Sequence, residues 1–223
     1  MDQPSFLFLV IINTYMLNSI FITGIGTDVG KTIVSAIVTE ALQADYWKPV
    51  QSGFPADKDL VTDLLSNKKS VVHKELYKFT MPVSPHLAAS EENEVIDLSQ
   101  IAEKLPITKN LLIIEGAGGL MVPLNNEEFI IDLIRKLKSK VIIVSDHYLG
   151  SINHSLMTAS ILKREGLDVL GWIFNSGPSV HEASIVKWSN LPMIASIPKM
   201  SKIDKHHIKV QADLIKTSLE KYL

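Results

Sequence analysis

The sequence contains no cysteine. Disulfide bridges, thiol nucleophiles and thiolate metal sites are therefore excluded. An excess of charge of either sign is also missing, because 22 basic residues stand against 24 acidic ones and the net charge is −2. A nucleic-acid-binding protein is expected to have a basic surface and a high isoelectric point, so the composition argues against that class of partner. The locally basic segment 199–209 is interpreted as a solvated helix face.

Long hydrophobic runs are lacking near the N-terminus as well. The apolar run Phe6–Ile12 has seven residues, which are too few to span a bilayer. Asp2 precedes this run in place of basic residues, and no small-residue cleavage pattern follows, which argues against a secretory signal. We expect translation to start at Met16. Residues 1–15 would then be a non-native or flexible extension of a domain that spans residues 16–223, the alternative being a real additional strand or arm.

Short apolar, β-branched runs alternate with helical patterns along the chain. Strands are predicted at Ser19–Thr23, Tyr46–Val50, Leu111–Glu115, Val141–Ser145, Val169–Asn175 and Met193–Ile197, and helices at Lys31–Gln43, Asp57–Asn67, Leu98–Lys104, Glu127–Lys138, Ser151–Glu165, Val180–Ser189 and Lys205–Tyr222. Continuous apolar runs are typical of strands buried on both faces of a parallel sheet. The pattern predicts one α/β domain of three layers, with a mostly parallel central sheet flanked by helices. Residues 77–93, which include two prolines, are expected to form a loop.

The glycine-rich stretch Thr23–Thr32 is the most informative feature. It follows a predicted strand and precedes a helical pattern, the context in which Gly-Lys-Thr forms a phosphate-binding loop. Glycines allow backbone N–H groups to surround phosphate oxygens, and the helix N-terminus adds partial positive charge. Lys31 is expected to reach the β- and γ-phosphates and Thr32 to ligate Mg²⁺. Five residues separate Gly24 from Gly30, so the loop belongs to a variant class of this motif, and a plain glycine-rich turn is the weaker alternative.

Other polar residues follow predicted strands, where ligands bind in open α/β folds. Glu115 begins a second glycine-rich segment and is expected to hold Mg²⁺, which prefers oxygen ligands. Lys48 is suited to neutralising an anionic intermediate or a transferring phosphoryl group, and Ser52 to hydrogen bonding. Asp59 and Asp63 lie one helical turn apart, so either is a candidate magnesium ligand. Each candidate has a simpler interpretation. Glu115 would be a surface residue in a tight turn, Lys48 a solvated lysine, and the two aspartates surface charges.

The segment Leu149–His154 lies between a predicted strand and a predicted helix. Exposed N–H groups at the helix start could bind a carboxylate, although an N-cap formed by Ser151 is the simpler interpretation. The seven histidines show no metal-ligand spacing.

Taken in order, these segments resemble the dethiobiotin synthetases, ATP-dependent carboxylases of biotin synthesis. The variant loop spacing is that of this family. Two features depart from the family pattern: Asp28 stands where members commonly carry glutamate, and the segment after Ile197 matches only at Pro198. The matching segments, within roughly residues 21–200, are Thr23–Thr32, Lys48–Gly53, Ser84–His86, Glu115–Gly119, Leu149–His154 and Gly171–Asn175.

The resemblance implies a cytoplasmic ligase of biotin biosynthesis that acts as a homodimer, with no nucleic-acid or membrane partner. Its substrates would be 7,8-diaminononanoate, CO₂ or bicarbonate, and ATP, with Mg²⁺ as cofactor. One amine would take up CO₂ as a carbamate, whose oxygen attacks the γ-phosphate to give a carbamic–phosphoric anhydride. The second amine would then close the ring, yielding dethiobiotin, ADP and phosphate.

The resemblance also implies roles for individual residues. Lys31 and Lys48 would be catalytic, and Lys48 would stabilise the carbamate and the phosphoryl transfer. Mg²⁺ would be held by Thr32, Asp59 and Glu115, with Asp63 as the alternative to Asp59. The substrate would contact Ser52 and, from the partner subunit, Gly150, Ser151, Ile152 and Asn153. The nucleotide would be held by Asp28, Val29, Gly30, Lys31, Thr32, Ile33, Asp59, Glu115, Gly116, Ala117 and Gly118, with Asn175, Pro198, Lys199 and Met200 meeting adenine.

A nucleotide-dependent switch, like the partitioning and septum-site ATPases, is the alternative function. Those proteins carry a signature lysine five residues before the loop lysine, whereas this chain has Gly26 there. A cobyrinate amidotransferase would need a glutaminase domain with a cysteine, and the sequence has no cysteine.

Overall fold

A six-stranded sheet forms the centre of the computed structural model, which describes residues 18–223. Every pairing between its neighbouring strands is parallel. The expectations for residues 1–15 and for a start at Met16 lie outside the described residues. In spatial order the strands are β2 (Asp45–Trp47), β5 (Leu112–Gly119), β1 (Ser19–Gly24), β6 (Lys140–Ser145), β7 (Val169–Gly177) and β8 (Met193–Pro198).

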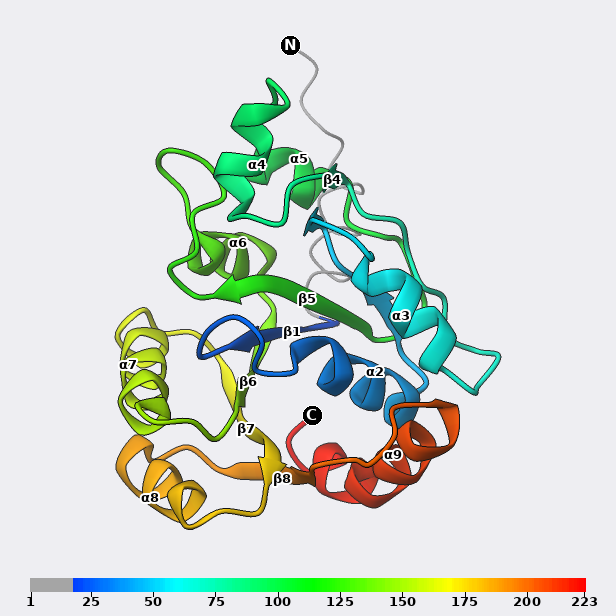
Figure 1. Cartoon of the computed structure of the whole chain (residues 1–223), viewed down its shortest axis with the longest axis vertical. Coiled ribbons are helices and arrows are strands. Elements are labelled where there is room, and N and C mark those ends of the chain that lie inside the picture. Colours follow the sequence, from blue (N-terminus) through cyan, green and yellow to red (C-terminus); the bar gives the residue numbers. More distant parts are fainter. Residues whose placement is uncertain (1–17) are drawn as a thin grey trace.

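Helices cover both faces of this sheet (Figure 1). One face carries α2 (Lys31–Leu42) and α9 (Lys205–Glu220), which pack against each other, with α3 (Asp57–Leu64) beside α2. The other face carries α6 (Ile130–Leu137), α7 (Ser151–Arg164) and α8 (Val180–Ser189). The predicted three-layer α/β fold is therefore confirmed.

The middle strands are buried on both faces, as their continuous apolar runs predict. Phe21 and Ile22 in β1, Ile113 and Ile114 in β5, and the run Val141–Val144 in β6 are almost fully shielded from solvent. Side chains of successive strand residues point to opposite faces, so each layer of helices packs on one half of these residues. The sheet is consequently rigid at the edge where its strands end.

The predictions for two segments are wrong in detail. The single strand expected at Tyr46–Val50 is divided, because Pro49 has no N–H with which to continue a ladder. The chain leaves the main sheet there, and β3 (Val50–Ser52) pairs in parallel with β4 (Tyr77–Phe79) in a separate two-stranded sheet. The expected loop 77–93 contains β4 and helix α4 (Pro85–Glu91), since proline is well tolerated in the first turn of a helix. Helix α5 (Leu98–Glu103) follows.

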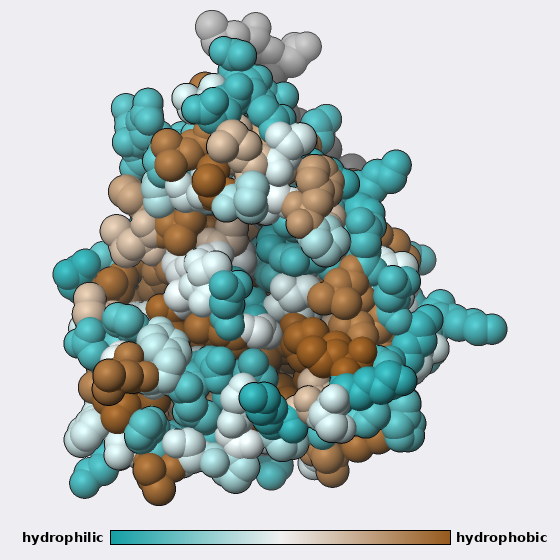
Figure 2. Space-filling model, in the orientation of Figure 1, coloured by the Kyte–Doolittle hydropathy of each residue, from teal (hydrophilic) through white to brown (hydrophobic). Residues whose placement is uncertain are grey.

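The surface mixes small apolar patches with hydrophilic side chains on the face drawn in Figure 2, as is usual for globular proteins. In the described part of the chain no helix combines the length and apolarity needed to cross a membrane. The basic segment at the start of α9 is largely solvated, and Lys209 pairs there with Asp213.

The edge strand β2 is held in place by the buried carboxylate of Asp45. It accepts hydrogen bonds from the Val71 N–H at 2.9 Å and from Asn110 Nδ2 at 2.8 Å, and it lies 3.2 Å from His73 Nε2. Burial alone would raise the pKa of Asp45, but these hydrogen bonds outweigh it and hold the pKa below its ordinary value. The network ties β2 to the segments that precede β4 and β5.

We predict that Asp45→Asn lowers the free energy of unfolding by about 1–3 kcal/mol at pH 7, because it leaves buried donors poorly paired. A carboxyl whose pKa is lowered by folding stabilises the native state above its unfolded pKa of about 4, and this contribution is lost as the pH falls through the folded pKa. Urea unfolding between pH 7 and pH 3 measures the free energy of unfolding of the unchanged protein and of the variant. The difference between the two should become smaller as the pH falls. A difference independent of pH would contradict the assignment.

Candidate functional site

A cavity of about 740 Å³ opens at the carboxyl ends of β1, β3 and β5. Its walls come from the loop between β1 and α2, the start of α2, the segments 48–57 and 82–85, and the end of β5. Open parallel sheets bind ligands at this edge. The cavity gathers residues that were predicted from separate parts of the sequence, whereas the predicted Val29 and Gly116 do not line it. The gathered residues are Asp28, Gly30, Lys31, Thr32, Ile33, Lys48, Ser52, Glu115, Ala117 and Gly118.

The loop between β1 and α2 has the conformation of a phosphate-binding loop, and the predicted strand–loop–helix arrangement is confirmed. Gly30 has φ +85°, and a Cβ on it would lie 2.2 Å from Asn175 Nδ2. The same Asn175 amide donates a hydrogen bond to the Val29 carbonyl at 3.3 Å. Only glycine can combine this backbone conformation with so close a neighbour. The end of β7 therefore packs directly on the loop.

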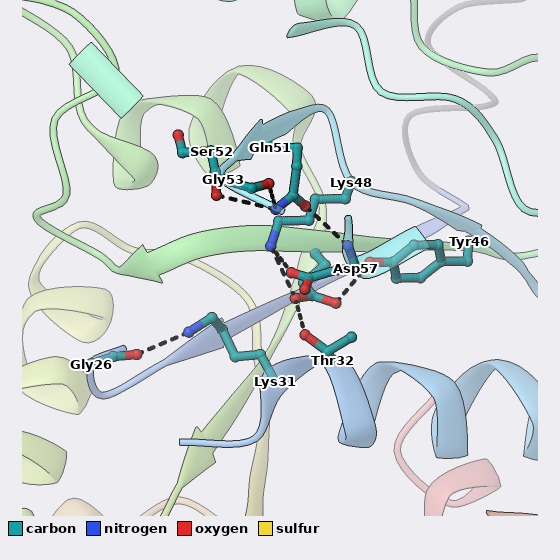
Figure 3. A network of polar contacts seen from close by, with 10 residues as sticks. Gly26, Lys31, Thr32, Tyr46, Lys48, Gln51, Ser52, Gly53 and Asp57 are labelled. Carbon is teal, nitrogen blue, oxygen red and sulfur yellow. Dashed lines mark hydrogen bonds and ion pairs between the residues drawn. The ribbon is translucent and has the colours of Figure 1, made fainter. Parts of the chain in front are cut away.

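Lys31 lies buried inside this loop. Its Nζ donates a hydrogen bond to the Gly26 carbonyl at 2.9 Å (Figure 3). Burial lowers the pKa of Lys31 to about 8, although the charge of Glu115 acts in the opposite direction. A lysine ammonium at the start of the helix after a glycine-rich loop is the group with which such loops hold phosphate.

The carboxylate of Glu115, 1% exposed, is the meeting point of three elements. Thr32 Oγ1 donates to its Oε1 at 2.9 Å, and the Tyr46 hydroxyl donates to its Oε2 at 2.8 Å. Lys48 Nζ lies 3.4 Å from Oε1 and forms a second ion pair with Asp57. Figure 3 shows Thr32, Tyr46 and Lys48 pointing towards this one place from α2, β2 and the β2–β3 link.

The two carboxylates of this cluster act on the pKa values of Lys48 and Tyr46. Burial alone would lower the pKa of Lys48, but the carboxylates of Glu115 and Asp57 outweigh it and raise that pKa above its ordinary value. Burial together with the same two carboxylates raises the pKa of Tyr46 well above its usual range, so its hydroxyl stays a donor. The cavity thus presents the ammonium of Lys48 next to the carboxylate of Glu115.

The structure brings Asp57, and not Asp59 or Asp63, to the cavity. Asp59 is 58% exposed and pairs with its neighbour Lys58, and Asp63 is also exposed. Since α3 begins at Asp57, residues two and six positions further on point away from its face. The amide of Gln51 fixes the intervening turn, because its oxygen accepts from the Asp57 N–H and its nitrogen donates to the Ser52 and Gly53 carbonyls.

Sequence reasoning missed Tyr46, Gln51 and Asp57. A tyrosine inside a buried strand is indistinguishable by pattern from a core residue, and Gln51 lies in a motif without an assigned task. Asp57 belongs to a helix with three aspartates, and the register of that helix depends on where the turn before it ends. One local signal could have pointed to Asp57. It is the first residue of its helix, a position at which acidic side chains are favoured.

Ser52 and the segment Gly150–Asn153 occupy different places. Ser52 lines the cavity, and its Oγ is buried with no hydrogen-bond partner among the described residues. Gly150–Asn153 forms the start of α7 and does not line this cavity. The Ser151 Oγ there is likewise buried and unpartnered within residues 18–223, while Leu149 beside it is fully exposed.

The end of β7 adjoins the loop on its other side, and the end of β8 lies beside β7. Asn175 contacts the loop, whereas Pro198 and Lys199, at and after the end of β8, are exposed and Met200 is half-buried. Behind them the buried carboxylate of Glu182 lies 3.0 Å from His147 Nε2 and accepts a hydrogen bond from Ser196 Oγ at 2.9 Å. This network joins the ends of β6, α8 and β8.

The fold and this loop define an α/β protein of the phosphate-binding-loop class. A septum site-determining protein MinD complexed with Mg-ADP from Pyrococcus horikoshii superposes with a TM-score of 0.57 at 16% identity, covering 90% of this chain and 93% of that one. A ParA family ATPase from Chlorobium tepidum gives 0.53 at 13% identity, covering 92% and 96%. At such low identity these likenesses establish the fold alone.

Sequence comparison is more specific. A family model described as an AAA domain matches residues 18–207. ATP-dependent dethiobiotin synthetases from Christiangramia forsetii and Cytophaga hutchinsonii are each 46% identical, over 92% and 86% of this chain and 99% and 94% of their own lengths. The Chlamydia felis protein of the same name is 36% identical over 90% of this chain and 95% of its own. The chain belongs to the ATP-dependent dethiobiotin synthetase family, so the alternative of a switch ATPase is not favoured.

We predict that Gly30→Ala weakens ATP binding and lowers stability more than Gly166→Ala does. Both glycines have left-handed backbones, whose cost for alanine is about 1–2 kcal/mol. A Cβ at Gly166 meets nothing within 4 Å, whereas one at Gly30 displaces Asn175. Thermal unfolding and ATP titration of both variants separate backbone strain from the clash. Equal effects would mean that Asn175 does not constrain the loop.

Proposed function

We propose that this chain catalyses the ATP-dependent carboxylation and ring closure of 7,8-diaminononanoate to dethiobiotin. The observation that carries the proposal is the buried Lys48–Glu115 pair in one cavity with the Lys31 loop, in a chain 46% identical to named ATP-dependent dethiobiotin synthetases. The net reaction consumes the diamine, CO₂ and ATP and yields dethiobiotin, ADP and phosphate.

The reaction divides into three bond-forming steps. An uncharged amine nitrogen adds to CO₂ and loses a proton, which gives a carbamate. A carbamate oxygen then bonds to the γ-phosphorus while the bond to the bridging oxygen of ADP breaks. The second amine attacks the carbonyl carbon of the resulting anhydride, phosphate leaves, and the five-membered cyclic urea is closed.

Lys48 supplies the positive charge that these steps need. The carbamate and the transferring phosphoryl group are both anionic, and a fixed cation stabilises developing negative charge in a shielded site. Because Glu115 and Asp57 raise the pKa of Lys48, its ammonium persists at neutral and mildly alkaline pH. The same condition favours an uncharged substrate amine. Phosphoryl transfer relies on positioning and charge neutralisation, for which Lys31 would hold the β- and γ-phosphates.

Mg²⁺ suits the oxygen donors of this cluster. Thr32 Oγ1 and the carboxylates of Glu115 and Asp57 gather at the phosphate end of the cavity. Mg²⁺ is commonly held by one or two carboxylates together with substrate phosphates. We therefore assign Thr32, Glu115 and Asp57 as its ligands, with Asp57 in the place expected for Asp59. When bound, the ion would neutralise charge on the γ-phosphate.

The remaining contacts belong to the substrate and the adenine. The unpartnered Ser52 Oγ is available to an amine or carbamate group of the substrate. Gly150–Asn153 starts α7 away from this cavity, which supports its use by the partner subunit of a homodimer to hold the substrate carboxylate. Asn175, Pro198, Lys199 and Met200 are proposed to meet adenine. We assign the enzyme to the cytoplasm.

The proposed function predicts that purified protein releases phosphate from Mg-ATP and bicarbonate only when 7,8-diaminononanoate is present. Dethiobiotin should appear by mass spectrometry in equal amount to the phosphate. Lys48→Met serves as the control and should reduce turnover about a hundredfold. Phosphate release that ignores the diamine would refute the proposal and favour a nucleotide switch.

The metal assignment predicts opposite outcomes for two aspartates on the same helix. Asp57→Asn should lower turnover at least about tenfold and raise the Mg²⁺ concentration needed for half-maximal rate. Asp59→Asn, at an exposed position, should leave both quantities near those of the unchanged protein. Magnesium titrations at saturating ATP measure both. The reverse pattern would restore Asp59 as the ligand.

A further inference from the structure

Phe54 lines the mouth of the cavity yet remains 58% exposed. An aromatic ring buries a large apolar area when it is covered, so leaving one open at a site offers surface to a ligand. The residue lies on the short turn between Ser52 and Asp57, both of which face the cavity. A ligand bound by Ser52 would therefore lie close to Phe54.

A lysine side chain contacts one face of the Phe54 ring. Lys78 Nζ lies 4.8 Å from the ring centroid, in a cation–π contact. Lys78 belongs to β4, whose pairing with β3 fixes it relative to the start of this turn. One face of the ring is thus occupied by a cation, while the residue also lines the cavity.

A second loop closes against the turn and extends the apolar surface. Gly53 has φ +78°, and a Cβ on it would lie 2.7 Å from the Pro82 Cβ. The two loops therefore touch at their backbones. Together Phe54, Pro55, Pro82 and Val83 give apolar lining to a cavity that also holds Lys31, Lys48 and Glu115.

This combination matches a ligand with one polar reacting end and an apolar chain. In the proposed substrate a vicinal diamine is joined to the carboxylate by a run of methylene groups. With the diamine held at Lys48 and Ser52, the methylene carbons next to it would lie beside Phe54, which is only two positions after Ser52. We propose that Phe54 is a specificity-determining residue whose ring packs on the methylene chain of the diamine, an inference that rests on the proposed function.

The kinetic test compares Phe54→Ala with the unchanged protein, separately for each substrate. Phe54→Ala should raise the KM for 7,8-diaminononanoate about tenfold, the effect of losing apolar contact in a pocket, and leave the KM for ATP and the melting temperature nearly unchanged. Phe54→Leu, which keeps an apolar side chain, should recover most of the loss. Ile107→Ala, at a 77% exposed residue that does not line this cavity, is the matched control.

Two outcomes overturn the inference. The first is a KM for the diamine that does not change in Phe54→Ala, and the second is an equal rise in the KM for ATP, which would indicate a general disturbance of the site. A wild-type protein that forms no dethiobiotin would instead refute the proposed function.

A binding measurement distinguishes failure of the Phe54 contact from failure of the proposed function. In Phe54→Trp the new indole would lie at the cavity mouth, and its emission should shift to the blue when the diamine covers it. The parent protein, with buried Trp47 and Trp172 and exposed Trp188, gives the background in the same titration. An emission shift upon adding diamine supports the contact even without turnover, and no shift at saturating diamine rejects it.

Discussion

The site depends on one buried carboxylate. Glu115 ends the apolar part of β5 with almost no access to water, and an unpaired charge there would be very costly. Thr32, Tyr46 and Lys48 each satisfy part of it, and they come from the helix after the phosphate loop, the edge strand and the link to the small sheet. Removing any of them leaves the others facing an incompletely paired anion. The same group therefore sets the geometry of both the proposed nucleotide end and the proposed carbamate end of the cavity.

Neighbouring layers reinforce this arrangement without entering the cavity. The carboxylate of Asp45 secures the strand that carries Tyr46 and leads to Lys48. On the other side, the contact of Asn175 with the Val29 carbonyl seats the phosphate loop against β7. Glu182, His147 and Ser196 join the strand ends beyond it. These hydrogen bonds hold the segments around the cavity in place, and fixed positions are what a reaction based on positioning requires.

Much of this could be predicted from the sequence, because the strongest signals are local. The glycine loop with Lys31 and Thr32 needs only the chain on either side of it, and apolar runs reveal buried parallel strands. What escaped prediction depends on contacts between distant segments. The role of Tyr46 exists only because β5 pairs beside β2, and the choice of Asp57 over Asp59 depends on how Gln51 shapes a turn. Pro49 indicates a break in a strand, but the path of the chain afterwards depends on pairing with β4, which begins 28 residues later at Tyr77.

The departure of the chain at Pro49 has a consequence for how such a protein can diversify. Before that proline, β1 and β2 belong to the large sheet, and the loop after β1 carries residues proposed to hold phosphate. Everything from Ser52 to Phe54 leans on the two-stranded sheet and on the loop at Pro82. The boundary between these two parts lies at Pro49. Lys48 precedes it, and the residues that line the apolar part of the cavity follow it. Substitutions in this apolar lining that leave Gln51 and its bond to Asp57 in place can therefore reshape the part proposed to contact the amine while the proposed nucleotide site keeps its geometry.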